Sequence, residues 1–319
     1  MARVRGRSFL ETGRAEICAV AARSTETAGQ CAMELDCDLH HNDFHRLADS
    51  QPDAILIEVP HKAQDEIAVW ALEAGFDLLI GGSLASNLRN GHRILEIATR
   101  RDRIVEVGYQ RRYDTAWEEI RQLIVDCILG EPVMAVSMAL WNPDPHQWYY
   151  DQIASGGMPL THLSYCYLNA IRWILGKPTF VSAAANQKVE KSKRHVLEET
   201  CAALIQFESG AFVSATGSYI GPNGMANAET RFICADGGIQ VNAEDTTGES
   251  SITVYHRGQS EVRSFKKKKS PFGREAEAFL ETIESRNHGR NPPADALLDL
   301  RIAEAISISA QENRTVSLE

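Results

Sequence analysis

The first 110 residues alternate short apolar runs with amphipathic stretches, and this order restricts the fold more than any other feature of the chain. The apolar runs have the length of buried strands, and the stretches between them carry apolar residues at helical spacing. We expect strands at residues 16–22, 53–59, 77–80 and 104–107, and helices at residues 25–35, 64–74 and 87–99. Apolar strands that alternate with helices of about ten residues predict βαβ units and a parallel sheet with both faces covered.

The pattern changes after residue 132, where apolar and polar residues alternate along the chain. Such alternation predicts a mostly antiparallel sheet with one buried face. We expect strands at residues 133–140, 180–185, 201–207, 212–218, 230–235 and 251–255, and helices at residues 159–175, 273–285 and 295–310. The four lysines at residues 266–269 indicate a solvated loop.

These two patterns predict a chain of class α/β plus α+β with two domains. We expect residues 1–115 to form a Rossmann-like parallel-sheet domain. Residues 116–319 are expected to form an α+β domain in which an open sheet carries helices on one face.

Charge and composition exclude several classes of protein. The chain has 33 Lys and Arg against 43 Asp and Glu, which disfavours binding to nucleic acid because such binding needs a basic face, and we expect no nucleic-acid partner. No run approaches the roughly 18 apolar residues of a membrane span, and the N-terminus lacks the apolar core of a signal peptide. Seven scattered cysteines without a Cys-x-x-Cys pair predict reduced thiols and a cytoplasmic location.

Several stretches together carry a resemblance to a known family. They lie at residues 53–60, 71–75, 108–114, 130–132, 148–157, 168–176, 237–238 and 271–318. In this order and spacing the chain resembles the glucose–fructose oxidoreductase/inositol dehydrogenase (Gfo/Idh/MocA) family. The resemblance implies NAD(P) in the first domain, a sugar, cyclitol or similar small molecule against the second, and hydride transfer between them. It also implies a homo- or hetero-oligomer that forms through the second domain's sheet.

The expected phosphate-binding loop departs from the family. A Gly-x-Gly-x-x-Gly loop lets backbone approach the pyrophosphate at a helix N-terminus. Here only Gly6 falls on a glycine of the pattern, with Met1 and Arg3 at the first two positions. We therefore expect a domain without its first strand, explained either by a misassigned or truncated start or by a real loss.

Other residues of the first domain are expected to contact a cofactor if one binds. The cofactor candidates are Gly6, Arg23, Ser24, Pro60, His61, Gly81 and Gly82. Arg23 and Ser24 stand where an acidic residue would hold the ribose of NAD, so they favour NADP, although Arg23 also fits a solvated helix start. The cofactor is thus expected to be NADP or NAD, or absent altogether.

The resemblance also implies a Lys, an Asp and a His or Tyr at the catalytic centre. Gly82, His162 and Cys166 stand at these positions. On a helix His162 and Cys166 would share one face, which leaves three readings: pocket lining, an acid/base or nucleophile pair, or half of a metal site. Asp144 and His146 are nearby in sequence, but we expect no metal.

A further set of residues is expected to contact substrate. It comprises Tyr109, Arg111, Arg112, Trp148, Tyr149 and Tyr165. The arginines at the exit of a parallel strand fit a carboxylate or phosphate ligand, or an ion pair between the domains. The aromatic residues fit stacking on a sugar, or packing of one domain on the other.

Three hypotheses about function follow. The first is a sugar- or polyol-directed oxidoreductase homologue whose NAD(P)-dependent activity is weakened, lost or repurposed. The second is a catalytically silent subunit that pairs with an active relative. The third is an intact NADP-dependent dehydrogenase whose N-terminus is truncated.

Overall fold

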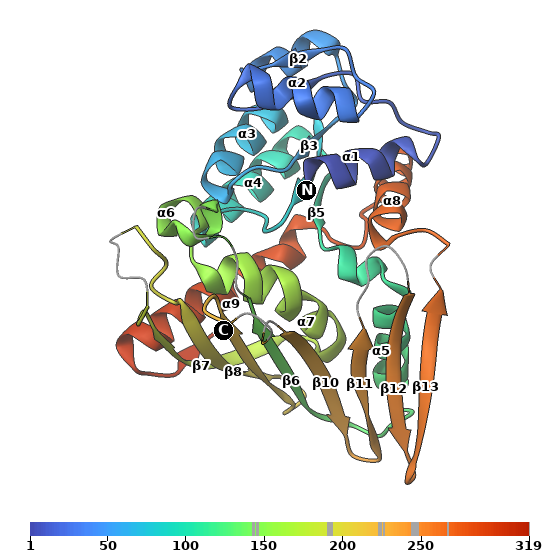
Figure 1. Ribbon diagram of the computed structural model, residues 1–319, viewed down its shortest axis with the longest axis vertical. Coiled ribbons are helices and arrows are strands. Elements are labelled where there is room, and N and C mark those ends of the chain that lie inside the picture. Colours follow the sequence, from blue (N-terminus) through green and yellow to red (C-terminus); the bar gives the residue numbers. More distant parts are fainter. Residues whose placement is uncertain are drawn as a thin grey trace.

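The computed structural model describes residues 1–318 except 142–143, 145–146, 190–193, 223–224, 226, 244–248 and 267. Figure 1 shows a helix-rich domain above a broad sheet, with helices between the two. The prediction of an α/β domain followed by a mostly antiparallel sheet domain is confirmed.

The first domain follows the predicted alternation of strands and helices. Its elements are α1 (Ala2–Leu10), β1 (Val20–Ala21), α2 (Thr25–Glu34), β2 (His40–His41), η1 (Phe44–Ser50), β3 (Ala54–Ile57), α3 (His61–Glu73), β4 (Asp77–Gly81), α4 (Leu88–Arg101) and β5 (Val105–Gly108). Strands β3, β4 and β5 pair in parallel, and β1 pairs in parallel with β2.

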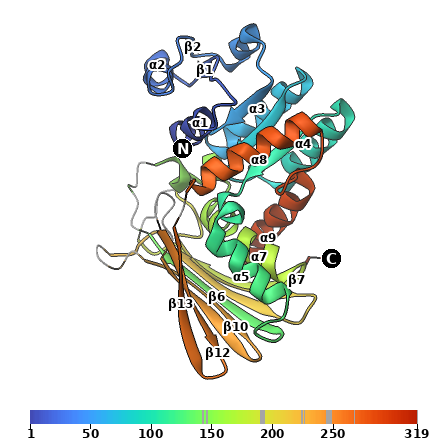
Figure 2. The same cartoon turned by 90° about the vertical axis from the view of Figure 1, so that its right-hand side faces the viewer.

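The N-terminal segment forms a helix, so the chain begins with α1 rather than with a strand. Within the described residues, β1–β2 and β3–β4–β5 are two separate sheets. The strand expected over residues 16–22 is correspondingly short, because it has a partner along one edge only. Figure 2 shows α1 beside α8 (Pro271–Ser285). The ring of Phe9 on α1 packs edge-on against the ring of Phe279 on α8.

The second domain is built on one large sheet. Helical elements η2 (Gln110–Tyr113) and α5 (Thr115–Val125) lead into it. Its strands are β6 (Pro132–Leu140), β7 (Pro178–Asn186), β8 (Thr200–Phe207), β9 (Phe212–Ser218), β10 (Asn227–Cys234), β11 (Gly237–Ala243), β12 (Glu249–His256), β13 (Gln259–Lys266) and β14 (Val316–Ser317). Within the described residues all neighbouring pairs are antiparallel except β6 with β9.

Four of the described strands escape prediction from the sequence, and two of them, β2 and β14, have only two residues each. Strand β11 begins with Gly237 and Gly238, whose residue type signals a turn, and β13 is a polar strand at the sheet's edge. The lysine run is therefore partly misassigned, because Lys266 is the last residue of β13.

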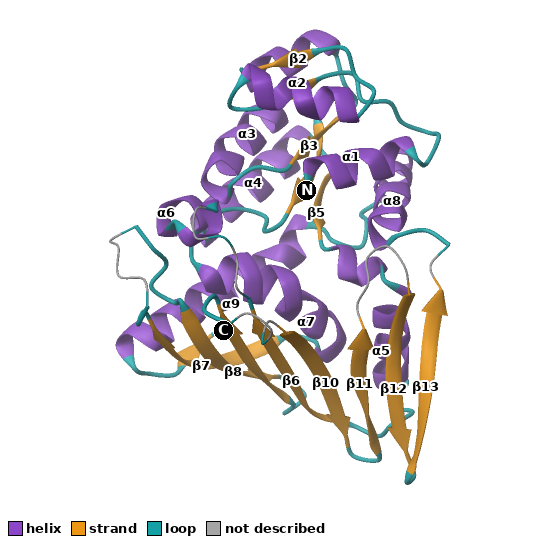
Figure 3. Cartoon of the chain, in the orientation of Figure 1, coloured by secondary structure: helices purple, strands orange, loops and turns teal. Residues whose placement is uncertain are grey.

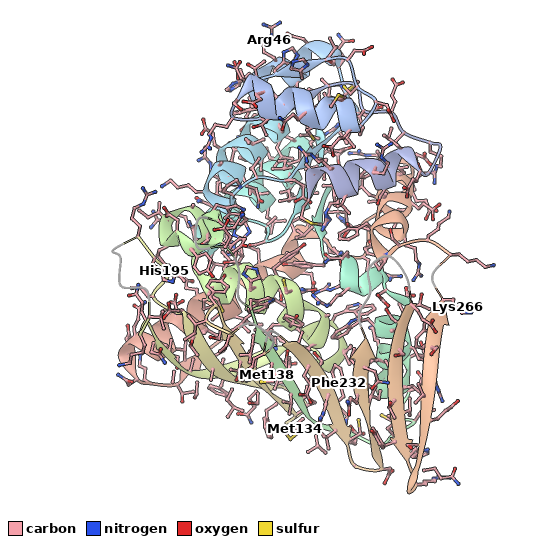
Figure 4. All side chains as sticks on the ribbon, viewed as in Figure 1. Arg46, Met134, Met138, His195, Phe232 and Lys266 are labelled. Carbon is pink, nitrogen blue, oxygen red and sulfur yellow. The ribbon has the colours of Figure 1, made fainter. Side chains whose placement is uncertain are left out.

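One face of this sheet is covered by helices. They are η4 (Pro159–Leu168), α7 (Asn169–Leu175) and α9 (Pro293–Glu312), together with α5. The short element η3 (Trp148–Tyr150) leads into α6 (Gln152–Ser155), which contacts α3, whereas α8 packs on α1. Figure 3 shows the covering helices above the strands, which leaves the lower face of the sheet bare. Met134 and Met138 extend from that bare face in Figure 4.

Helix α9 joins the two domains. Leu297 and Leu300 pack in the core of the first domain, whereas Ile302 and Ile306 pack in the core of the second. No described helix is long and apolar enough to cross a membrane.

Candidate functional site

The site is built where the carboxyl ends of β3, β4 and β5 approach helix η4. Open parallel sheets bind ligands at this edge. Strand β3 ends at Ile57, and α3 begins at His61 after three intervening residues, with Pro60 as an N-cap that makes no side-chain hydrogen bond. The backbone of Gly82 follows β4 with φ of +80°, a conformation that favours glycine.

Helix η4 has π-helical hydrogen bonding, which is uncommon and often marks functional sites. Most of its residues are buried, but His162, Tyr165 and Cys166 are half-buried. The exposed face of η4 therefore carries these three side chains, in agreement with the expectation that His162 and Cys166 share a face.

Two imidazoles and four aromatic rings form one cluster. This imidazole–aromatic cluster comprises His61, Trp141, Trp148, Tyr149, His162 and Tyr219. The ring of His61 lies 5.1 Å from that of Trp148, and the ring of His162 lies 5.1 Å from that of Tyr149, centre to centre. The two histidines come from different domains, so docking of the domains brings them together.

Burial keeps both imidazoles uncharged. Desolvation lowers the pKa of His61 to about 4, although a hydrogen bond with the carbonyl of Ser155 opposes this shift. Desolvation, and to a smaller extent the field of His61, lowers the pKa of His162 to about 4. Nδ1 of His162 lies 2.6 Å from Oη of Tyr219, which fixes the ring.

The charge of His162 bears on what it can do for Cys166 on the same helix. Since the pKa of His162 is about 4, this imidazole is uncharged near neutral pH. A neutral imidazole does not form an ion pair with a thiolate, but it can accept a proton as a general base. Pocket lining and acid/base chemistry therefore both stay predictions for this pair.

A buried ion-pair network covers the strand ends. Arg5 reaches Glu58 (Nε to Oε1, 2.6 Å) and Glu275 (Nη1 to Oε2, 2.6 Å), and it donates to the carbonyl of Gly108 at 2.7 Å. A Cβ placed on Gly81 would lie 2.0 Å from the Glu58 carboxylate. None of these three charged residues was predicted from the sequence, although Glu58, the only acid within an apolar run, was a usable signal.

The arginines after β5 serve the contact between the domains. Arg112, whose side chain is 1% exposed, bonds Asp295 at 2.7 Å and the carbonyl of Asn169 at 3.0 Å. The sequence left two roles open for Arg112, contact with a carboxylate or phosphate ligand or an ion pair between the domains, and the structure has the ion pair. Arg111 donates to the carbonyl of Cys166, and its guanidinium lies 4.3 Å from the ring centre of Tyr167.

The other residues expected to contact substrate differ in how far their side chains are exposed. Tyr109 is buried, with its ring 6.2 Å from that of Tyr165. Tyr165 is half-buried and donates to Oε1 of Gln110 at 3.2 Å. Trp148 and Tyr149 are also half-buried and belong to the imidazole–aromatic cluster.

The cofactor candidates near the N-terminus lie away from this cluster. Gly6 is in the middle of α1, where a Cβ would lie 2.8 Å from Leu35, so its role here is close helix packing. Arg23 is exposed after β1. The hydroxyl of Ser24 accepts from the backbone N–H of Thr27 and caps α2.

A metal cluster is not found among the described residues, which contain no group of His, Cys, Asp and Glu that could hold a metal, and His146 lies outside them. A cavity of about 650 Å³ is lined by residues of α3, α4 and α6. Its lining residues include Lys62, Trp70 and Arg93.

Comparisons with known proteins agree with this architecture. Residues 1–109 match the family model "Oxidoreductase family, NAD-binding Rossmann fold", and residues 121–318 match "Oxidoreductase family, C-terminal alpha/beta domain". The structure superposes on aldose-aldose oxidoreductase from Caulobacter crescentus with a TM-score of 0.87 and 22% identity, covering 99% of this chain and 96% of that one.

Two curated relatives match this chain over part or most of its length. An inositol 2-dehydrogenase/D-chiro-inositol 3-dehydrogenase of Halalkalibacterium halodurans is 30% identical over 142 residues, which span 44% of this chain and 40% of that enzyme. A D-xylose 1-dehydrogenase [NADP(+)] of Haloarcula marismortui is 21% identical over 95% of this chain and 86% of its own length.

Proposed function

The chain belongs to the Gfo/Idh/MocA oxidoreductase family, and we propose that it binds a sugar, cyclitol or related polyol at the imidazole–aromatic cluster. We further propose that its NAD(P)-dependent hydride transfer is weakened, lost or redirected. The observation that carries the proposal is the uncharged imidazole of His61 beside Gly82, where the family has an ammonium group, with the uncharged His162 in the same cluster.

The residues of the first domain fit a dinucleotide in part. The N-terminus of α1 has no side-chain cap, so its first N–H groups are suited to a pyrophosphate. The exposed Arg23 is suited to a 2′-phosphate, which favours NADP over NAD. Arg5 and Glu58 cover the strand ends, however, and this buried pair limits access to the nicotinamide half of the site.

The chain's own groups are suited to holding neutral hydroxyls. The half-buried Trp148 and Tyr149 offer apolar faces to the C–H groups of a polyol, and His162 with Tyr219 offers a hydrogen-bonded pair for a proton. A bound nicotinamide would supply the hydride acceptor or donor. Without a Lys at position 82, no ammonium group stabilises the alkoxide that develops on the substrate, and this is the reason for expecting slow chemistry.

A fluorescence titration with NADPH and NADH tests the cofactor part. We expect saturable quenching of tryptophan fluorescence at micromolar NADPH, with weaker binding of NADH. His162→Ala should bind NADPH as the wild type does but lose affinity for myo-inositol and D-xylose, measured by calorimetry. If neither dinucleotide binds up to millimolar concentration, the dehydrogenase part of the proposal is wrong and a cofactor-free role replaces it.

The bare face of the sheet supports a proposal about assembly. Phe180, Leu204 and Tyr255 are 40%, 47% and 45% exposed there, an unusual share of large apolar side chains for a solvated surface. We propose that a second subunit, identical or related, covers this face. Native mass spectrometry should show an oligomer that Leu204→Lys dissociates, and a monomeric wild type would contradict the proposal.

A further inference from the structure

One atom of the imidazole–aromatic cluster makes no hydrogen bond within the described residues. This atom is Nε2 of His61, a residue that is only 3% exposed, and it is not one of the side-chain atoms that the fold closes off from solvent. A polar atom of a largely buried residue normally bonds to the protein, to ordered water or to a ligand, so an incoming ligand can reach and satisfy this nitrogen.

The tautomer of His61 follows from its other nitrogen. Nδ1 lies 2.7 Å from the carbonyl oxygen of Ser155, and a carbonyl oxygen can only accept. Nδ1 therefore carries the hydrogen, and Nε2 of the neutral ring carries a lone pair. The partner that this atom lacks is a hydrogen-bond donor.

The position of Nε2 shows where that donor would stand. A Cβ placed on Gly82 would lie 3.2 Å from Nε2, so the imidazole occupies the space beside the end of β4 that a side chain at residue 82 would enter. The indole of Trp148 packs edge-on against the same ring. The atom thus lies between the strand end and the aromatic side chains of the cluster.

From this geometry we propose that His61 is the substrate-positioning acceptor of the site, with Nε2 receiving a hydrogen bond from one hydroxyl of a neutral polyol. The inference rests on the proposed function, because it names a contact within the same site. It assigns His61 to the substrate, whereas the sequence predicted a contact between His61 and the cofactor. A hydroxyl suits the atom, since an uncharged acceptor offers nothing to a carboxylate or a phosphate.

The test combines NMR spectroscopy with binding. In protein labelled with ¹⁵N-histidine, we expect one ring with protonated Nδ1 and bare Nε2, and this signal is identified by its loss in His61→Asn. Asparagine keeps a donor for the Ser155 carbonyl but removes the acceptor beside Gly82, so the fold is preserved. His92→Asn, on the exposed face of α4, is the matched control.

Added myo-inositol or D-xylose should shift the Nε2 resonance of His61. The affinity of His61→Asn for that polyol should fall about two- to tenfold, the effect of one hydrogen bond, whereas His92→Asn binds as the wild type does. If His61→Asn binds the polyol as tightly as the wild type and the polyol does not shift the Nε2 resonance of His61, the role of His61 is wrong while the proposed function still stands. A wild type that binds none of the polyols overturns the proposed function and this assignment with it.

Discussion

The buried ion pairs between α7 and α9 yield a quantitative prediction about stability. Arg172 on α7 contacts Asp299 on α9 through two hydrogen bonds of 2.8 and 2.9 Å, and it also bonds Asp295 at 2.7 Å. The side chains of Arg172 and Asp299 are only 5% and 2% exposed. We consider the substitution Arg172→Met, which keeps the volume of the side chain but removes its charge and its donors.

The magnitude follows from the burial of the partner that remains. Breaking a buried pair leaves an uncompensated charge and costs about 3–5 kcal/mol. Arg112 lies 3.9 Å from Asp299 and offers partial compensation, so we expect a loss of about 3 kcal/mol. For a domain of this size that loss lowers Tm by roughly 6–12 °C.

Urea unfolding followed by tryptophan fluorescence measures the effect, and Trp173 provides a reporter next to the substituted residue. The control is Arg46→Met, since Arg46 and Asp49 form an exposed pair with side chains 61% and 59% accessible. Such a pair contributes about 0–1 kcal/mol. The reasoning is refuted if the two variants lose the same free energy of unfolding within about 0.5 kcal/mol.

Two further predictions concern Glu106 and Gly82. Burial raises the pKa of Glu106 to about 7, above its value in the unfolded chain, so the folded state holds this proton more tightly and loses stability as pH rises from about 4.5 to about 7. In Glu106→Gln, the urea midpoint should change less with pH across this range than it does in the wild type. Glu96→Gln, at an exposed position, is the control and should leave the pH dependence unchanged. A Glu106→Gln variant with the pH dependence of the wild type would contradict the pKa shift. Gly82→Ala should cost more free energy of unfolding than Gly75→Ala, because both have positive φ but only the alanine at 82 meets His61; equal costs would argue against that contact.

Local patterns account for the parts of the fold that the sequence predicts. Helical and strand periodicity depends on which face of an element is buried, and this information is present in each short window of the chain. The same windows do not show the edge strand β13 or the glycine start of β11, where pairing with neighbours overrides weak local preference.

The candidate site was only partly predictable. His162, Cys166, Trp148 and Tyr149 were expected in it, and the structure places them on η4 or in the imidazole–aromatic cluster. His61 was expected near a nicotinamide, but its hydrogen bond with Ser155 depends on α6 of the second domain.

The sequence by itself determined the class of each domain and the order of its elements, because hydrophobic periodicity is a local property of the chain. Only the tertiary structure decided which side chains meet. Docking of η4 and α6 against the ends of β3 and β4 buries His61 and His162 together, and this shared burial keeps both imidazoles neutral. The same docking places Arg112 in an ion pair with α9 instead of in a ligand site, since charge compensation depends on neighbours that are distant in sequence.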